Sequence, residues 1–208
     1  KEDVIRLIDE KGMLTDELTA KILECEKLVD VEDIYRPYKE KKKTKATVAI
    51  NDGLEGLAKI IMSFPDRELD EILDSYNDCK VDSREKKLEG AKYIIAEWIS
   101  DNASYRKWIR NFFYKNGIII SKIKKNALDN DKVYEMYYDY KEPVRFIKPH
   151  RILALNRGEK EKILTVSVDV SRDDITKFLQ KKIIKNNSSS VSNSVKEAIE
   201  DSYKRLIA

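Results

Sequence analysis

The longest helical pattern in the sequence runs from Ser83 to Ile99, and it limits the available folds more than any other feature. Its apolar side chains recur three or four positions apart, which places them on one wide face of a helix. Gly90 lies within this face, where the missing side chain lets another helix approach closely. The pattern predicts a helical core built around this segment. The apolar face consists of Leu88, Ala91, Ile94, Ile95, Trp98 and Ile99.

Shorter amphipathic patterns on both sides predict further helices. Thr15 is suited to cap one helix, and Asp101 or Asn102 is suited to cap another. The helix that begins after Asn102 is rich in aromatic residues. We interpret Trp98, in segment 83–99, and Trp108, in segment 102–116, as core residues rather than as a stacking platform. The expected helical segments are 1–10, 15–29, 53–64, 66–76, 83–99, 102–116, 131–140, 171–185 and 194–207.

The periodicity changes to that of strands between residues 149 and 170. In segment 163–170, apolar residues alternate with Thr, Ser and Asp, which is the pattern of a strand with one buried face. We expect it to pair with segment 152–156 through a turn at 157–159, while 118–125 forms a short extended piece. The fold class is therefore mainly α, a multi-helix scaffold with one small β-hairpin near residues 151–170.

The expected domain organisation follows from these patterns in three parts. Residues 1–148 form a helical region with a basic loop at 35–45, and residues 149–170 form a hairpin packed on the helices. Residues 171–208 form the last helices.

Composition excludes several classes of protein. Six glycines and four prolines among 208 residues are too few for a turn-rich all-β fold. No run of about 18 apolar residues is present, so no membrane span or membrane partner is expected. Cys25 and Cys79 lack metal-binding or redox spacing, and no secretory signal is visible. These features favour a reduced, cytoplasmic protein.

A basic loop follows the first helices. Segment 36–45 holds six Lys and Arg residues against the single Glu40, whereas the whole chain has a net charge of +3. Tyr35 and Tyr38 flank these cations, which suits phosphate contact combined with base stacking, although a solvated surface loop is the alternative. A second, weaker cluster follows residue 121. The candidate nucleic-acid-binding residues are Arg36, Lys39, Lys41, Lys42, Lys43, Lys45, Lys122, Lys124 and Lys125.

Motifs that would indicate an enzyme are missing from the sequence. His150 is the only histidine, no Gly-x-Ser-x-Gly elbow accompanies it, and no phosphate-binding glycine loop occurs. Two unspaced cysteines do not make a zinc site with it. We therefore expect no catalytic residue, no metal and no cofactor, and we interpret His150 as a hydrogen-bonded structural residue.

Several stretches resemble the Tex family of bacterial transcription accessory proteins, in its N-terminal region. They follow the family's order along most of the chain, and the most specific is Pro149-His-Arg-Ile-Leu-Ala-Leu-Asn-Arg-Gly-Glu-Lys-Glu161. The others are 33–46, 53–58, 90–103 with 109–110, 120–122, 138–143 and 198–207.

The Tex resemblance implies a mostly helical, multidomain protein that binds nucleic acid. It also implies that a nuclease-like domain, helix-hairpin-helix elements and an OB-fold RNA-binding domain follow the region seen here. The family's own start is expected to precede Lys1. No catalytic residue of the family maps onto these positions.

Two functional hypotheses remain open at this point. The first is a non-catalytic, nucleic-acid-associated module that makes weak, sequence-independent phosphate contacts with RNA or DNA. The second is a protein-interaction scaffold that docks the other Tex domains or the transcription machinery without contacting nucleic acid. One continuous basic face joining the two lysine clusters would favour the first hypothesis, and a large exposed apolar patch would favour the second.

Overall fold

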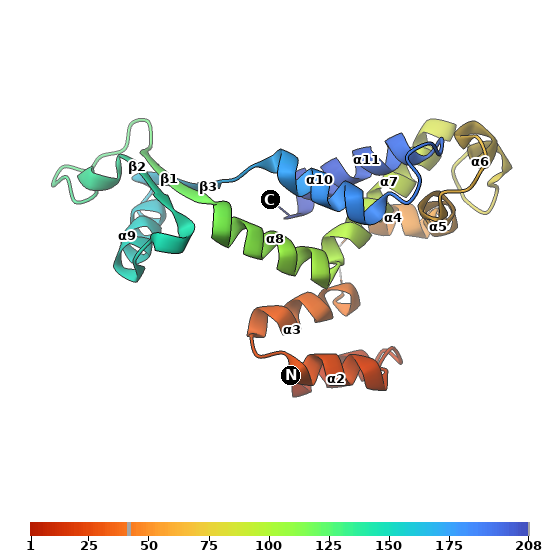
Figure 1. Ribbon diagram of the computed structural model, residues 1–208, viewed down its shortest axis with the longest axis horizontal. Helices are drawn as coiled ribbons and strands as arrows, with labels where there is room; N and C mark the ends of the chain where they lie inside the picture. The colour runs from red at the N-terminus through yellow and green to blue at the C-terminus, as the bar shows by residue number, and fades with distance from the viewer. Residues whose placement is uncertain (41–42, 208) are drawn as a thin grey trace. The chain divides into compact units, whose positions relative to one another are not determined.

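A computed structural model describes residues 1–40 and 43–207, which divide into two compact units (Figure 1). The helical unit consists of residues 1–107 together with the residues from Asp173 onward, and the sheet unit consists of residues 108–172. The chain leaves the helical unit within helix α8 (Ala103–Asn116) and returns at the start of α10 (Arg172–Ile183). The boundaries between these units, after residues 107 and 172, differ from those of the three segments expected from the sequence, after residues 148 and 170.

The elements of each unit follow the chain. The helical unit holds α1 (Glu2–Asp9), α2 (Asp16–Glu24), α3 (Leu28–Tyr35), the 3-10 helix η1 (Arg36–Tyr38), α4 (Lys45–Asn51), α5 (Glu55–Ser63), α6 (Leu69–Ser75), α7 (Arg84–Asp101), most of α10, α11 (Ser192–Asp201) and the π-helical turn η4 (Ser202–Ile207). The sheet unit holds β1 (Ile118–Ile123), η2 (Glu135–Tyr137), β2 (Asp139–Pro143), η3 (Val144–Phe146), α9 (Pro149–Lys160) and β3 (Leu164–Asp169). The predicted fold class, mainly α with one small β element, is confirmed, and the β element is a three-stranded antiparallel sheet where a hairpin was expected.

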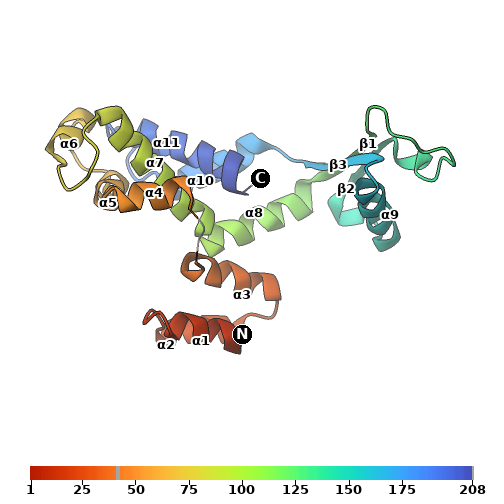
Figure 2. The same ribbon diagram turned by 180° about the vertical axis from the view of Figure 1, so that it is seen from behind.

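Helix α7 is the centre of the helical unit, as its apolar face predicts. Helices α4, α5, α6 and α11 pack on it (Figure 2). Ile94 and Ile95 are fully buried in this packing. A Cβ atom added at Gly90 would lie 2.3 Å from Leu54 Cδ1 and 3.2 Å from Ala49 Cβ. The close approach predicted at Gly90 is therefore confirmed.

The first three helices have a small core of their own. Ile8, Ile22 and Val31 are buried together, and Tyr35 and Tyr38 pack against them. The Thr15 hydroxyl accepts a hydrogen bond from Leu18 N at 3.2 Å, so the predicted cap is confirmed. The two tyrosines beside the basic loop thus contribute to this core.

The sheet unit is built on three antiparallel strands in the order β2-β1-β3. Helix α9 packs on β3, and the buried core beneath the sheet combines Leu155 and Leu164 with Tyr134 and Tyr137. Residue Ile120 lies opposite Lys141 of β2 and Ser167 of β3 in the register. This register decides which side chains share each face of the sheet.

The predicted first strand of the hairpin, residues 152–156, is wrong because these residues belong to α9. Pro149 lies in the first turn of this helix, where its missing N–H costs no hydrogen bond. Gly158 is inside the helix, and a Cβ atom there would lie 2.6 Å from Leu164 Cδ1. The glycine therefore serves close packing against β3, which pairs with β1.

The aromatic residues are less buried than the sequence suggested. Trp98 and Trp108 are half-buried, and Trp108 stacks on Phe112 with the ring centroids 5.1 Å apart. The isoleucines of α7 fill the interior instead. Within residues 1–40 and 43–207, no helix is long and apolar enough to cross a membrane.

Candidate nucleic-acid interface

The basic loop is shorter than predicted because α4 begins inside it. The Thr44 hydroxyl accepts a hydrogen bond from Thr47 N at 3.0 Å, and the Thr47 hydroxyl accepts one from Thr44 N at 2.7 Å. This reciprocal capping starts the helix at Lys45. At the other end, Arg36 belongs to η1.

Two of the predicted phosphate-contacting residues are engaged within the protein. Arg36 Nε donates to Asp101 Oδ1 at 3.0 Å. Lys45 Nζ donates to Tyr93 Oη at 3.0 Å and lies 4.5 Å from the centre of the ring. The hydrogen bond to Tyr93 raises the pKa of Lys45. Both cations therefore contribute to contacts between helices.

The remaining cations of the loop differ from these two. Lys39 and Lys43 are exposed, and neither forms an ion pair with the residues that the structure describes. Lys41 and Lys42 lie outside the described residues. Of the predicted loop residues with a described position, Lys39 and Lys43 present their charge to solvent.

The second predicted cluster lies in the sheet unit. Lys122 is exposed in β1, Lys125 is exposed just after the strand, and Lys124 is half-buried with its N–H donating to Ile163 O at 2.8 Å. The two lysine clusters belong to different compact units, and each is described by itself.

The sheet brings Lys141 to the same surface as Lys122. Side chains directly opposite each other in a sheet share a face, and side chains two positions apart along a strand do so as well. Lys122 lies opposite Asp139, and Lys141 lies opposite Ile120, so both lysines are on one face. This open face, which is the face away from the buried core, carries Ile118, Ile120, Lys122, Asp139, Lys141, Pro143, Thr165, Ser167 and Asp169. Sequence reasoning missed Lys141 because segment 131–140 was expected to be a helix, whereas strand β2 begins at Asp139.

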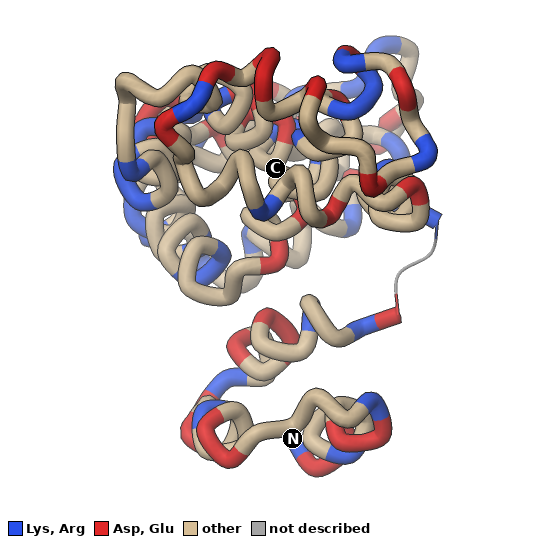
Figure 3. The backbone as a smooth tube through the Cα atoms, turned by 90° about the vertical axis from the view of Figure 1, so that its right-hand side faces the viewer, with Lys and Arg blue, Asp and Glu red and all other residues tan. Residues whose placement is uncertain are grey.

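The net charge of the two units differs in sign. The sheet unit contains 14 Lys and Arg residues against eight Asp and Glu residues, a net charge of +6. The helical unit contains 27 against 30, a net charge of −3. Segments with Lys or Arg and segments with Asp or Glu are interspersed along the backbone (Figure 3), so the difference in net charge becomes clear only when each unit is counted by itself.

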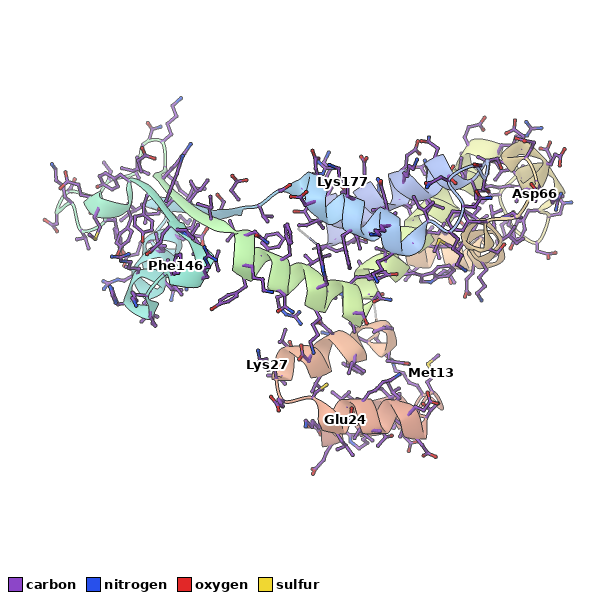
Figure 4. The ribbon with its side chains drawn as sticks, in the orientation of Figure 1. Met13, Glu24, Lys27, Asp66, Phe146 and Lys177 are labelled. Atoms are coloured by element: carbon purple, nitrogen blue, oxygen red, sulfur yellow. The ribbon has the colours of Figure 1, made fainter. Side chains whose placement is uncertain are left out.

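A second group of exposed residues follows β2. Phe146, labelled in Figure 4, is 58% exposed. The Arg145 guanidinium carbon lies 4.6 Å from the centroid of its ring. Lys148 is also exposed. His150 is exposed in the first turn of α9, with no hydrogen bond to the described residues, so its interpretation as a hydrogen-bonded structural residue is wrong.

The connection between β1 and β2 is held by one carboxylate. Asp129 accepts hydrogen bonds from Val133 N at 3.0 Å, Tyr134 N at 2.9 Å and Tyr138 Oη at 2.8 Å. Burial would raise the pKa of Asp129, but these three donors outweigh it and lower the pKa. Burial and the bond to Asp129 raise the pKa of Tyr138 to about 12.

Beside this connection lies a pocket of about 260 Å³ against α9. It is lined by Val133, Tyr134, Leu153, Ala154 and Arg157. Among the described residues, no three His, Cys, Asp or Glu side chains are grouped to hold a metal ion.

Comparison with known proteins places this arrangement in a family. An uncharacterized protein of Bacillus subtilis, YdcI, is 54% identical over all of this chain, which spans 29% of that protein. The transcriptional accessory protein Tex of Neisseria gonorrhoeae is 29% identical over 84% of the chain and 23% of its own length. The human S1 RNA-binding domain-containing protein 1 is 31% identical over 98% of the chain and 22% of its own length.

The chain thus spans less than a third of each of these relatives. The Tex resemblance seen in the sequence is confirmed, and the matching family model describes the central region of Tex rather than its N-terminal region. Because this model matches residues 62–204, more than half of the chain, the chain belongs to the Tex central region-like family.

Proposed function

We propose that the chain is a non-catalytic module of a Tex-like transcription accessory factor that contacts nucleic acid through phosphates, without reading its sequence. The names of two relatives support the class of partner, since one is a transcriptional accessory protein and the other contains an S1 RNA-binding domain. Because the chain covers under a third of these proteins, its own contribution has to be argued from its surface.

The observation that carries the proposal is the net charge of +6 in the sheet unit, with exposed lysines on the open face of its sheet. Lys122 and Lys141 share this face, and Lys125 is exposed beside it. Ammonium groups on flexible stems neutralise phosphates and release counterions, but they carry no information about base sequence. The expected binding is therefore weak, strongly dependent on salt, and similar for RNA and DNA.

The basic loop adds a smaller contribution in this proposal. Lys39 and Lys43 are exposed and unpaired among the described residues, whereas Arg36 and Lys45 already contact Asp101 and Tyr93. Lys122 and Lys141 on the open face, together with Lys39 and Lys43 in the loop, would make four phosphate contacts. With about 0.7 counterions released per contact on single strands, the slope of log affinity against log salt is near −3.

The first experiment is fluorescence anisotropy of a labelled oligothymidylate and of an oligouridylate against the 208-residue chain. Affinity should fall about fiftyfold between about 50 and 200 mM salt, and both oligonucleotides should behave alike. A slope near zero would contradict phosphate contact.

Three charge-reversal variants locate the surface. Lys122→Glu/Lys141→Glu should remove most of the binding, and Lys39→Glu/Lys43→Glu should weaken it less. Lys21→Glu/Lys177→Glu is a matched control, since both residues are exposed in the helical unit and the change in net charge is the same. Equal losses in all three variants would mean that net charge alone, and not the open face of the sheet, accounts for the binding.

A protein-docking scaffold is the second candidate function. It is favoured by the pocket beside α9, where Val133 and Leu153 are exposed apolar residues. Exposed apolar side chains around a pocket are typical of protein contacts. Failure of the chain to bind either oligonucleotide would favour this second function.

A further inference from the structure

We infer that Phe146, with the cations beside it, is a base-stacking site that takes the unpaired bases of single-stranded nucleic acid. The inference rests on the proposed function and adds to it a specific ligand class, namely unpaired bases attached to a phosphate backbone.

The Phe146 ring is not part of the core. Phe146 is 58% exposed at the end of η3, whereas the next residue, Ile147, packs against the buried cluster of the sheet unit. The turn itself is anchored by its backbone, since Val144 N donates to Gly117 O at 2.9 Å. The ring is therefore presented to solvent on an anchored turn.

Two cations lie close to this ring in the sequence. Arg145 lies over the Phe146 ring at 4.6 Å, and Lys148 is exposed two residues further on. Segment 144–151 contains no Asp or Glu. The nearest carboxylate in the sequence, Glu142, accepts a hydrogen bond from Arg151 at 2.8 Å, so Arg151 offsets its charge.

An exposed aromatic ring between cations matches the needs of a single strand. A base stacks on the ring while the flanking phosphates meet the ammonium and guanidinium groups, and stacking tolerates any base because each has a π-face. In a duplex the bases are already stacked on one another, and only phosphates remain for contact. A protein partner would be favoured by an apolar surround, but the residues flanking Phe146 in the turn are Arg145 and, beyond Ile147, Lys148.

The test compares two single strands that differ only in their bases. Wild type and Phe146→Ala are titrated with a labelled oligothymidylate and with an abasic oligodeoxynucleotide of the same length. We expect Phe146→Ala to bind the oligothymidylate about fivefold more weakly and the abasic strand with unchanged affinity. The loss lies at the lower end for base stacking because Arg145 already lies over the ring.

Two variants separate stacking from other causes. Phe146→Tyr should retain binding because it keeps the ring, and Lys148→Ala should weaken both strands by similar factors because it removes a phosphate contact. Leu153→Ala is the matched control, since Leu153 is 69% exposed in the same unit but offers no ring, and it should change neither affinity. Circular dichroism and urea unfolding of each variant exclude loss of folding as the cause.

These measurements distinguish failure of the stacking site from failure of the proposed function. If Phe146→Ala binds the oligothymidylate as wild type does, or loses affinity for both strands equally, the stacking site is overturned. In that case the proposed function still stands when Lys122→Glu/Lys141→Glu abolishes binding. If the wild-type chain binds neither strand, both proposals are overturned.

Discussion

The two units of this chain use their charged residues in different ways. In the helical unit, several ion pairs join elements that are far apart in the sequence, beside local pairs such as that of Arg6 with Glu10. Arg106 Nε donates to Asp33 Oδ1 at 2.8 Å, and Lys92 Nζ lies 2.8 Å from Glu197 Oε2. The helical unit has a net charge of −3, so its cations are outnumbered by carboxylates.

In the sheet unit, several ion pairs are local. Arg157 pairs with Glu161 four residues away, and Lys132 pairs with Glu135 three residues away. Such pairs support a helix or a turn but connect no distant elements. With six more cations than carboxylates, the sheet unit leaves lysines such as Lys122 and Lys141 in solvent.

The comparison teaches that a run of cations in a sequence does not show which of them make contacts within the protein. The densest stretch of this chain contains Arg36 and Lys45, and both are engaged in contacts between helices. Lys122 and Lys141 are nineteen positions apart, yet the strand register places them on one face. The fold, rather than the run of charges, decides which cations remain available.

The largest expected effects come from removing one core side chain in each unit. Ile94→Ala in the helical unit and Leu164→Ala in the sheet unit each remove a fully buried side chain, and each should cost about 2–5 kcal/mol of stability. If the units are separate cooperative structures, hydrogen exchange followed by mass spectrometry should show the loss of protection mainly in the mutated unit.

Leu153→Ala removes an exposed side chain and is the control for this comparison. Loss of protection throughout the chain in both core variants would break the distinction between the units.

A smaller effect is expected when an ion pair between distant elements is broken. Arg106→Ala leaves the buried Asp33 without this guanidinium, and the side chains of the pair are 22% and 7% exposed. We expect a cost of about 2–3 kcal/mol, below the 3–5 kcal/mol of a fully buried pair. Urea unfolding provides the measurement.

Lys107→Ala is a matched control on the neighbouring residue. Its ammonium lies 3.5 Å from Asp30 but is largely exposed, so its loss should cost less than about 1 kcal/mol. Similar costs for the two variants would show that the Arg106 pair does not stabilise the unit as its burial indicates.

Features governed by neighbouring residues were predictable from the sequence. Thr15 and Asn102 cap the helices that follow them, with hydrogen bonds from Leu18 N and Tyr105 N. In both cases the residue type has a local physical consequence that packing elsewhere does not change.

Features governed by tertiary contacts were not predictable. The apolar run at 152–155 fits a strand or a buried helix equally, and Gly158 suggested a turn. The actual role of Gly158, close packing inside a helix, depends on the position of Leu164. Likewise, the surface formed by Lys122 and Lys141 depends on the pairing of β1 with β2, which short-range patterns do not specify.

The smallest expected effect is a pH-dependent loosening of the connection between β1 and β2. The pKa of Asp129 is lowered in the folded protein, so its stabilising contribution is fully present above its ordinary pKa of about 4 and is lost as the pH falls below that value. The pKa of Tyr138 is raised from 10.0 to about 12, so its contribution is present below pH 10.0 and is lost as the pH rises toward 12.

Nuclear magnetic resonance of the Val133 and Tyr134 amides between pH 2 and 6 should show the acid transition. Asp129→Asn should weaken this transition, because an amide does not titrate and its oxygen still accepts a hydrogen bond. Tyr138→Phe should leave the acid transition in place and remove the alkaline transition. Circular dichroism at alkaline pH provides this second measurement. If wild type and Asp129→Asn show the same acid transition, another carboxylate of the sheet unit, such as Glu142 or Glu161, controls this connection instead.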